Sequence, residues 1–257
     1  SSGTEKEGFG QIYATIFGMK SSYVVVHLGG SVVVPHMTDE GGINVLFLKE
    51  FLKFMRQHIR KQKRFIIVIG GGKVCRVYQR SARKVGKISN WDLDWIGIHA
   101  SRLNAHLLRT IFVKETYPVV IDHDPLEEEV EMMKHSDRNL FIASAWRPGW
   151  STDYVAVRLA EKFGASNVII AKDTPFVYDS DPRKNKDAKA FRKISWKAYK
   201  KIIPSTWTPG LSAPVDPVAT RLAEKIKVTA KVLKATDLKS FKAAIDGKSF
   251  EGTVITG

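Results

Sequence analysis

Residues 65–73 read Phe-Ile-Ile-Val-Ile-Gly-Gly-Gly-Lys, an apolar run that ends in three glycines. Residues 23–31, Tyr-Val-Val-Val-His-Leu-Gly-Gly-Ser, repeat this pattern. Each run is followed by apolar residues at helical spacing, over 73–85 and 43–59 respectively. Runs of β-branched residues favour strands, and a glycine turn between a strand and a helix is typical of parallel sheets that bind phosphates. The two units therefore predict an α/β fold with a mainly parallel central sheet and phosphate-facing turns.

A third turn of the same kind lies at residues 145–153, Ala-Trp-Arg-Pro-Gly-Trp-Ser-Thr-Asp. It follows the apolar run 140–143 and precedes a helical pattern over 155–163. Glycine lets the backbone approach a ligand, Ser or Thr caps the helix, and the free N–H groups face a phosphate. Taken alone, the stretch is equally well explained as an ordinary capped helix start. The two other turns favour the anion site.

The rest of the chain predicts further elements and one domain. They are a long helix over 91–112, a short strand over 118–121, an acidic mobile connection over 122–137, a strand over 168–171, an exposed polar loop over 183–193, a helix over 218–225, and strands over 228–233 and 252–255. Residues 1–18 begin Ser-Ser-Gly and precede Met19. We therefore expect a flexible or non-native leader, followed by a single domain over 19–257.

Composition is that of an ordinary globular protein, with 44% hydrophobic and 26% charged residues among 257. The single cysteine, Cys75, forms no internal disulfide, which together with the lack of a membrane-length apolar run favours the cytoplasm. The net charge of +15 indicates either attraction to polyanions or a solvated basic surface, and we favour the surface. Specific nucleic-acid binding is not expected, because no aromatic-plus-basic recognition motif is present.

Several common site signatures are missing. The segment Gly70-Gly71-Gly72-Lys73 lacks the first glycine and the Ser or Thr of a P-loop. No strand ends in Gly-x-Gly-x-x-Gly, no Gly-x-Ser-x-Gly elbow occurs, and the seven histidines and one cysteine show no zinc-like spacing. We therefore expect no protein metal centre. The interpretation that remains is a phosphate-binding site built without any of these motifs.

Six motifs occur in a recognisable order: VVVHLGGSVVVP, FIIVIGGGKVCRVYQ, LDWIGIHASRLNAHLL, WRPGWSTDYVAVRLAEKFGA, FVYDSDP with DAK soon after, and APVDPVATRLAEK. In this order the chain resembles the amino acid kinase superfamily, and within it the archaeal-type UMP kinases. The resemblance extends from about Tyr23 to the C-terminal Gly-Thr-Val-Ile, which is nearly the whole chain.

The resemblance implies a three-layer α/β/α sandwich, usually assembled into a hexamer. It also implies transfer of a phosphoryl group from Mg-ATP to UMP, which gives UDP in pyrimidine nucleotide biosynthesis. ATP and Mg²⁺ would be the cofactors, and UMP and ATP the small-molecule substrates. Because the two substrates together bring about six negative charges, such a site must supply backbone N–H groups, cations and metal rather than a strong nucleophile.

Carried over position by position, the resemblance divides the binding residues between two substrates. ATP would be bound on the donor side by Gly30, Ser31, Gly72, Arg76, Lys172, Tyr178 and Asp181. UMP would be bound on the acceptor side by Gly71, Asp94, Trp146, Arg147, Pro148, Gly149, Trp150, Ser151 and Thr152.

Four residues are candidates for catalytic roles, each with a structural alternative. Asp153 and Asp216 stand where the family keeps carboxylates that organise metal or lysine, although both could simply cap helices. Lys73 is either a phosphate contact or a solvated residue, and we favour the latter. His27 occupies a position where many superfamily members have a phosphate-binding lysine. A buried, hydrogen-bonded residue at a strand end explains His27 equally well.

Two features depart from the family pattern. Lys172-Asp173 and Pro175-Phe176 replace Thr-Asn and Asp-Gly in the donor loop, and Pro175 removes a backbone donor. Either adenine stacks differently there or ATP binds weakly. Trp146 and Trp150 would close over the acceptor base or fill a subunit contact, with plain packing as the alternative.

Two other functions stay open. One is a sister kinase of the same fold that acts on another small phosphate, a carboxylate, a carbamate or an isoprenoid phosphate. The other is a non-catalytic protein that binds an anion or nucleotide, which the donor loop and His27 motivate.

Overall fold

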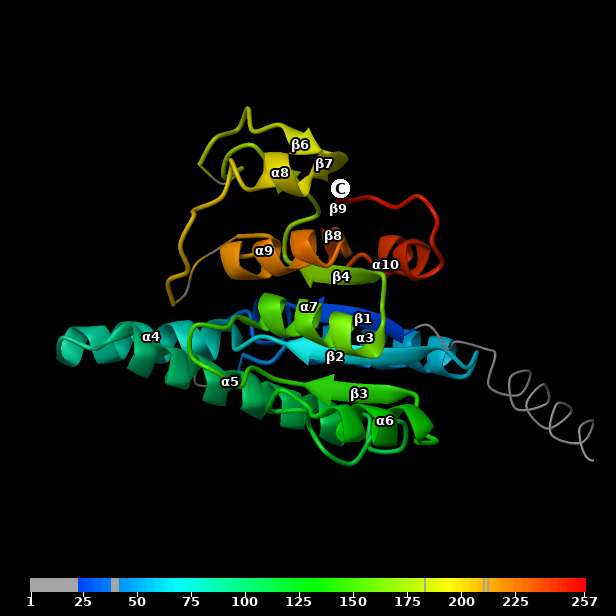
Figure 1. Ribbon diagram of the computed structural model, residues 1–257. Coiled ribbons are helices and arrows are strands. Elements are labelled where there is room, and N and C mark those ends of the chain that lie inside the picture. Colours follow the sequence, from blue (N-terminus) through cyan, green and yellow to red (C-terminus); the bar gives the residue numbers. More distant parts are fainter. Residues whose placement is uncertain (1–22, 38–41, 183, 210, 212) are drawn as a thin grey trace, which may run out of the picture.

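The computed structural model describes residues 23–37, 42–182, 184–209, 211 and 213–257. The predicted leader over 1–18 lies outside these residues. Figure 1 shows helices on both faces of a central sheet, so the described chain forms three layers. No helix in the described ranges combines the length and apolar character needed to cross a bilayer.

The sheet has the strand order β3-β2-β1-β4-β8-β9-β7. Five strands are mutually parallel: β1 (Tyr23–Leu28), β2 (Arg64–Ile69), β3 (Leu140–Ala143), β4 (Asn167–Lys172) and β8 (Thr229–Lys234). Strand β9 (Thr253–Thr256) pairs antiparallel with β8, and β7 (Lys193–Ser195) pairs parallel with β9. A small hairpin of β5 (Val177–Tyr178) and β6 (Ala190–Phe191) stands beside the sheet. The predicted mainly parallel α/β sandwich is confirmed.

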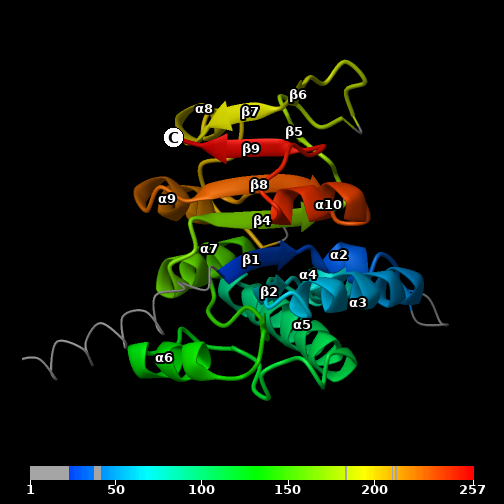
Figure 2. The ribbon, with the colours of Figure 1, turned by 90° about the vertical axis from the view of Figure 1, so that its right-hand side faces the viewer.

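Each face of the sheet carries its own hydrophobic core. One core contains residues of α6 (Glu127–His135), α7 (Thr152–Phe163), α8 (Trp196–Tyr199) and α9 (Pro217–Lys225). The opposite core contains residues of α2 (Gly30–Val33), α3 (Val45–Ile59), α5 (Asn90–Ile111) and α10 (Leu238–Ile245), and Figure 2 views this side. Both faces of the central strands are covered, which explains why their sequences are continuous apolar runs rather than alternating ones.

The predicted mobile connection over 122–137 is wrong, because it contains α6. The three glutamates that made this segment look solvated form the first helical turn, where negative charge is stabilised by the helix dipole. Glu129 accepts a hydrogen bond from the backbone N–H of Leu126 at 2.6 Å. Val130 and Met133 of the same helix are buried in the core.

Arg64 holds the other end of α6. Its guanidinium donates to the carbonyls of Met133 and Lys134 at 2.9 and 2.5 Å, and also to those of Ser136 and Arg138. The guanidinium lies 4.9 Å from the ring centroid of Tyr23. A single arginine therefore supplies the partners that the last carbonyls of this helix lack.

Other predictions need smaller corrections. Residues 118–121 form no strand, since only isolated bridges at Thr116 and Ile121 join this segment to β3. The predicted loop over 183–193 includes β6 and the first residue of β7, although residue 183 itself is not described. The helix predicted over 73–85 is present as α4 (Gly72–Val85), and Tyr78 on this helix is 58% exposed.

Candidate active site

The three glycine-bearing turns meet in one cleft at the C-terminal ends of the parallel strands. This cleft contains about 1080 Å³ of empty space, part of it open to solvent. The predicted residues that line it come from both proposed substrate sides: His27, Gly30, Ser31, Gly71, Gly72, Arg76, Asp94, Trp150, Ser151, Thr152, Asp153 and Lys172. This is the edge at which open parallel sheets bind ligands.

The two glycine turns after β1 and β2 pack directly against each other. A Cβ atom at Gly30 would overlap the backbone oxygen of Gly70 and the backbone nitrogen of Gly72. Gly72 itself has a φ of +66°, which side-chain-bearing residues rarely adopt. Glycine at these positions is therefore required by close backbone approach and by conformation, and the two turns behave as one unit.

Buried polar groups of α5 fix the turn after β2. The hydroxyl of Ser101 donates to the carbonyl of Ile69 at 2.6 Å and accepts from the N–H of Ala145 at 2.9 Å. The side-chain amide of Asn104 donates to the carbonyl of Gly70 at 2.8 Å. These two residues were not predicted, although polar residues three positions apart on an otherwise apolar helix face are a usable signal.

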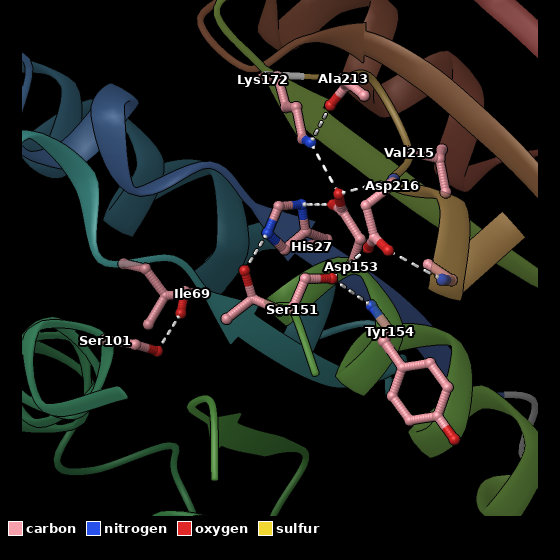
Figure 3. Close-up of polar contacts among 12 residues, drawn as sticks. His27, Ile69, Ser101, Ser151, Asp153, Tyr154, Lys172, Ala213, Val215 and Asp216 are labelled. Carbon is pink, nitrogen blue, oxygen red and sulfur yellow. Dashed lines mark hydrogen bonds and ion pairs between the residues drawn. The ribbon is translucent and has the colours of Figure 1, made fainter. Parts of the chain in front are cut away.

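A buried network of charges forms the floor of the cleft (Figure 3). Oδ1 of Asp153 lies 2.9 Å from Nδ1 of His27, and Oδ2 lies 3.0 Å from Nζ of Lys172. Lys172 also donates to the carbonyl of Ala213 at 2.9 Å. Burial raises the pKa of Asp153, but Lys172 and then His27 outweigh burial and hold the pKa below its ordinary value. Asp153 is therefore a permanent carboxylate that positions two neighbours.

His27 is buried at the end of β1 and bound on both ring nitrogens. In addition to the Asp153 contact, its Nε2 lies 2.9 Å from the hydroxyl oxygen of Thr152. This geometry agrees with the alternative interpretation of a hydrogen-bonded strand-end residue. It also places the imidazole between the sheet and the first residue of α7.

Asp216 lies behind the cleft rather than in its lining. Its Oδ1 accepts from the N–H groups of Val218 and Ala219 at 2.7 and 3.1 Å, so it caps α9 as the alternative interpretation predicted. Its other oxygen accepts from the hydroxyl of Ser151, the residue that caps α7. Burial, followed by the negative charge of Asp153, raises the pKa of Asp216. A catalytic role for Asp216 stays a prediction.

The acceptor side is bridged by Asp94 of α5. Its Oδ2 accepts from the N–H of Gly149 at 2.7 Å and from the indole N–H of Trp207 at 3.5 Å. Burial raises the pKa of Asp94, and these two hydrogen bonds oppose the rise. Trp207 lines the cleft and was not predicted, because nothing in its local sequence links residue 207 to residue 94.

The two tryptophans of the third turn have different surroundings. Trp150 lines the cleft, and the guanidinium of Arg147 lies 5.0 Å from its ring centroid. Trp146 is 8% exposed and packs in the core on the α7 side. Trp146 therefore packs as a core residue, and its binding of the acceptor stays a prediction.

Several predicted residues lie outside the cleft lining: Lys73, Trp146, Arg147, Pro148, Gly149, Tyr178, Asp181 and Asp216. In the donor loop, Phe176 is buried, with the guanidinium of Arg192 4.7 Å from its ring centroid and Tyr178 edge-on to it. Cys75 does line the cleft, but burial raises the pKa of its thiol to about 11, so it stays protonated and unreactive at neutral pH.

Comparison with known proteins identifies the family of this chain. The sequence pattern of the Amino acid kinase family matches residues 22–234 of this chain. The chain belongs to the amino acid kinase family. Family relatives include the uridylate kinase of Sulfurisphaera tokodaii, 34% identical over 220 residues that cover 84% of this chain and 93% of the relative. The uridylate kinase of Hyperthermus butylicus is 28% identical over 93% of this chain and 100% of the relative.

Solved structures of the family agree. The structure of uridylate kinase from Archaeoglobus fulgidus matches with a TM-score of 0.73 and 29% identity, covering 91% of this chain and 100% of that one. The UMP kinase of Bacillus anthracis matches with a TM-score of 0.72 at 20% identity, over 91% and 96% of the two chains, and this likeness shows the fold alone.

Proposed function

We propose that this amino acid kinase transfers a phosphoryl group from Mg-ATP to UMP, giving UDP. One observation carries the proposal: the two packed glycine turns and the N-terminus of α7 open into the same cleft, with Lys172 fixed at its floor. Two phosphate-bearing substrates can meet there. The uridylate kinases among its relatives supply the identity of the acceptor.

Catalysis in this site is electrostatic. The transferred group passes through a transition state whose charge is spread over its oxygens, so positioned donors and cations lower the barrier. Backbone N–H groups at Gly30 and Gly72 and the guanidinium of Arg76 face the donor phosphates, and Lys172 offers a fixed ammonium. The acceptor phosphate is already a nucleophile, so no general base is required. Asp153, which stays ionised, acts by holding Lys172 and His27.

The acceptor binds on the opposite wall. The N-terminus of α7 favours an anion, and the Thr152 hydroxyl and nearby N–H groups hold the UMP phosphate. Gly71 lets the nucleotide approach the backbone closely. Asp94 accepts a hydrogen bond from the acceptor nucleoside, and Trp150 borders its base. Tyr178 and Asp181 act from the donor loop, outside the cleft lining.

Magnesium would enter with ATP rather than sit in a protein cage. Within the described ranges, no group of three or more His, Cys, Asp or Glu side chains is arranged to hold a metal. Both oxygens of Asp153 face His27 and Lys172, and Asp216 caps α9. The contacts of these two carboxylates do not fit a protein-held ion.

We further propose that the enzyme works in the cytoplasm as a homo-oligomer, a hexamer by analogy with the family. The paired helices α4 and α5 and the short connection between them expose several large apolar side chains: Tyr78, Val85, Ile88, Trp91 and Leu103. A second copy that covers this surface would remove apolar area from water, which favours association.

Release of ADP, measured across the nucleoside monophosphates with Mg-ATP, tests the proposed activity. We expect turnover with UMP and much weaker turnover with CMP. Lys172→Gln should abolish most of the UMP turnover, while Lys225→Gln on α9 serves as a control for loss of one positive charge. Equal turnover of UMP and CMP, or activity only on an unrelated acceptor, would contradict the assignment.

The non-catalytic alternative is separated by calorimetry with a non-hydrolysable ATP analogue. Binding that depends on Lys172 supports a kinase with an altered donor loop. If millimolar analogue produces no heat and UMP still binds, the protein is an anion binder of the same fold.

A further inference from the structure

A second pocket lies on the α10 side of the sheet, between β8, β9 and the loop that joins α10 to β9. It contains about 790 Å³ of empty space, part of it open to solvent, and shares no lining residue with the active-site cleft. Figure 2 shows α10 beside β8 and the chain that runs from α10 to β9. The pocket is therefore a separate feature of the opposite core face.

The loop that walls this pocket is held at several points. Gly247 follows the end of α10 with a φ of +69°, and the N–H of Lys248 donates to the carbonyl of Ala243 at 2.8 Å. The N–H of Glu251 donates to the hydroxyl of Ser240 at 3.1 Å. A Cβ at Gly252 would overlap both the carbonyl oxygen of Val232 and the ring of Phe250. The wall is thus preformed, which reduces the entropy lost when a ligand binds.

Positive charge gathers in this pocket without acidic partners. Arg192, Lys231 and Lys248 all line it, and none of its lining residues is a carboxylate. Asp246, in the adjoining loop, already forms ion pairs with Lys63 at 2.6 Å and Lys242 at 2.5 Å. The three lining cations therefore face the cavity without a neutralising group.

Each cation keeps donors free. The guanidinium of Arg192 lies over the face of Phe176, so the N–H groups along its edge remain available as a two-pronged donor. Lys231 uses one ammonium proton on the carbonyl of Ala244, at 2.8 Å. The ammonium of Lys248 has no partner among the described residues. Burial lowers the pKa of Lys231, because the charged ammonium loses contact with water. A bound anion would offset this loss of solvation.

We propose that this pocket is a second binding site for a small phosphate-bearing anion, held by Arg192, Lys231 and Lys248. Phosphate suits this site because its oxygens can accept from an arginine edge and from ammonium groups, and its negative charge complements the three lining cations. Inorganic phosphate, pyrophosphate and the phosphate tail of a nucleotide share this chemistry. The proposal does not depend on the reaction in the cleft.

Calorimetric titration of the full chain with pyrophosphate tests the proposal. We expect two sites in the wild-type protein, one in the cleft and one in this pocket. The double variant Arg192→Gln/Lys248→Gln should lose the second site, with affinity there falling by about a hundredfold for two charge-assisted contacts. Neither side chain has a hydrogen bond or ion pair with the described residues, so folding should persist. Lys172→Gln should weaken binding at the site in the cleft and leave binding at the site in this pocket unchanged.

Lys239→Gln is the matched control, because Lys239 is exposed on α10 and lies outside the pocket lining. If it weakens binding as much as the double variant, or if the double variant keeps both sites, only the general basic surface binds and the proposal is overturned. A tungstate-soaked crystal with density between the three cations supports it. ADP that binds there at least tenfold more tightly than pyrophosphate supports it too, and identifies a nucleotide as the ligand.

Discussion

Asp153 is the side chain at which the two halves of the cleft are joined electrostatically. It reaches His27 on β1 and Lys172 on β4 from the first turn of α7, and the N–H of Asp216 lies 3.3 Å from its Oδ2. Such a buried carboxylate is tolerated because its partners and their hydrogen bonds offset the cost of desolvation. Asp153 thereby fixes the positions of the Lys172 ammonium and the His27 imidazole.

Replacing Asp153 with Asn should destabilise the fold by about 3–5 kcal/mol at neutral pH, because Lys172 loses its buried counter-charge and His27 loses a carboxylate partner. The folded pKa of Asp153 lies below the ordinary value of about 3.9. The stabilisation is therefore fully present above about pH 4 and is lost as the pH falls through the folded pKa. Urea unfolding of both proteins from pH 7 to pH 3 measures this. This expectation is contradicted if the difference in unfolding free energy between the wild-type protein and the variant grows as the pH falls.

Trp207→Phe should raise the KM for UMP a few-fold and leave kcat nearly unchanged. The substitution keeps an aromatic ring at the cleft but removes the N–H that donates to Asp94. Because that hydrogen bond is 3.5 Å long, we expect an effect of only about 1 kcal/mol or less. Steady-state kinetics measure it, with Trp91→Phe on the exposed side of α5 as the control. A fall in kcat at constant KM would assign Trp207 to the chemical step instead.

At the level of elements, the turns after β1 and β2 act as one part. Gly30→Ala forces a methyl group into the backbone of the neighbouring turn, so it should lower the free energy of unfolding by about 1–3 kcal/mol. If the N–H groups of this turn bind phosphate as we propose, displacing them should also reduce turnover by about a hundredfold. Gly86→Ala is the control, since nothing lies within 4 Å of a Cβ there. Equal losses in both variants would show that close packing of the turns is not the cause.

The helix α6 depends on a residue far away in sequence. Arg64→Lys keeps the positive charge but cannot reach four carbonyls from one planar group. We expect a loss of about 2–3 kcal/mol and faster amide exchange confined to α6. Hydrogen exchange followed by mass spectrometry measures it. Unchanged exchange in α6 would show that its buried apolar residues suffice.

These elements show what the sequence could and could not predict. Strands β1, β2 and β3 were found within one residue, because both of their faces are buried and their sequences are almost entirely apolar. Helix α6 was missed because its stability comes from capping and from Arg64, which lies about 70 positions earlier. In the cleft, turn chemistry pointed to the glycines, whereas Ser101, Asn104 and Trp207 act through contacts that only the fold creates.

For the whole molecule, the exposed apolar surface of α4 and α5 predicts self-association. Leu103 is 64% exposed, so Leu103→Glu should leave the monomer fold intact but place charge on that surface. We expect the wild-type protein to sediment as an oligomer and the variant to shift toward smaller species at the same concentration. Met132→Glu, on the similarly exposed part of α6, is the control. Identical sedimentation of all three proteins would exclude this surface as the contact.

The position of β9 has a consequence for synthesis of the chain. It lies between β8 and β7, and Thr253 accepts from the N–H of Val177 and donates to the carbonyl of Phe191. Strand β7 and the β5–β6 hairpin leave the ribosome well before residues 253–256, and their partners arrive only then. Until that moment β7 is an unpaired edge that can join another nascent chain. Premature termination should therefore yield aggregates rather than a smaller folded kinase.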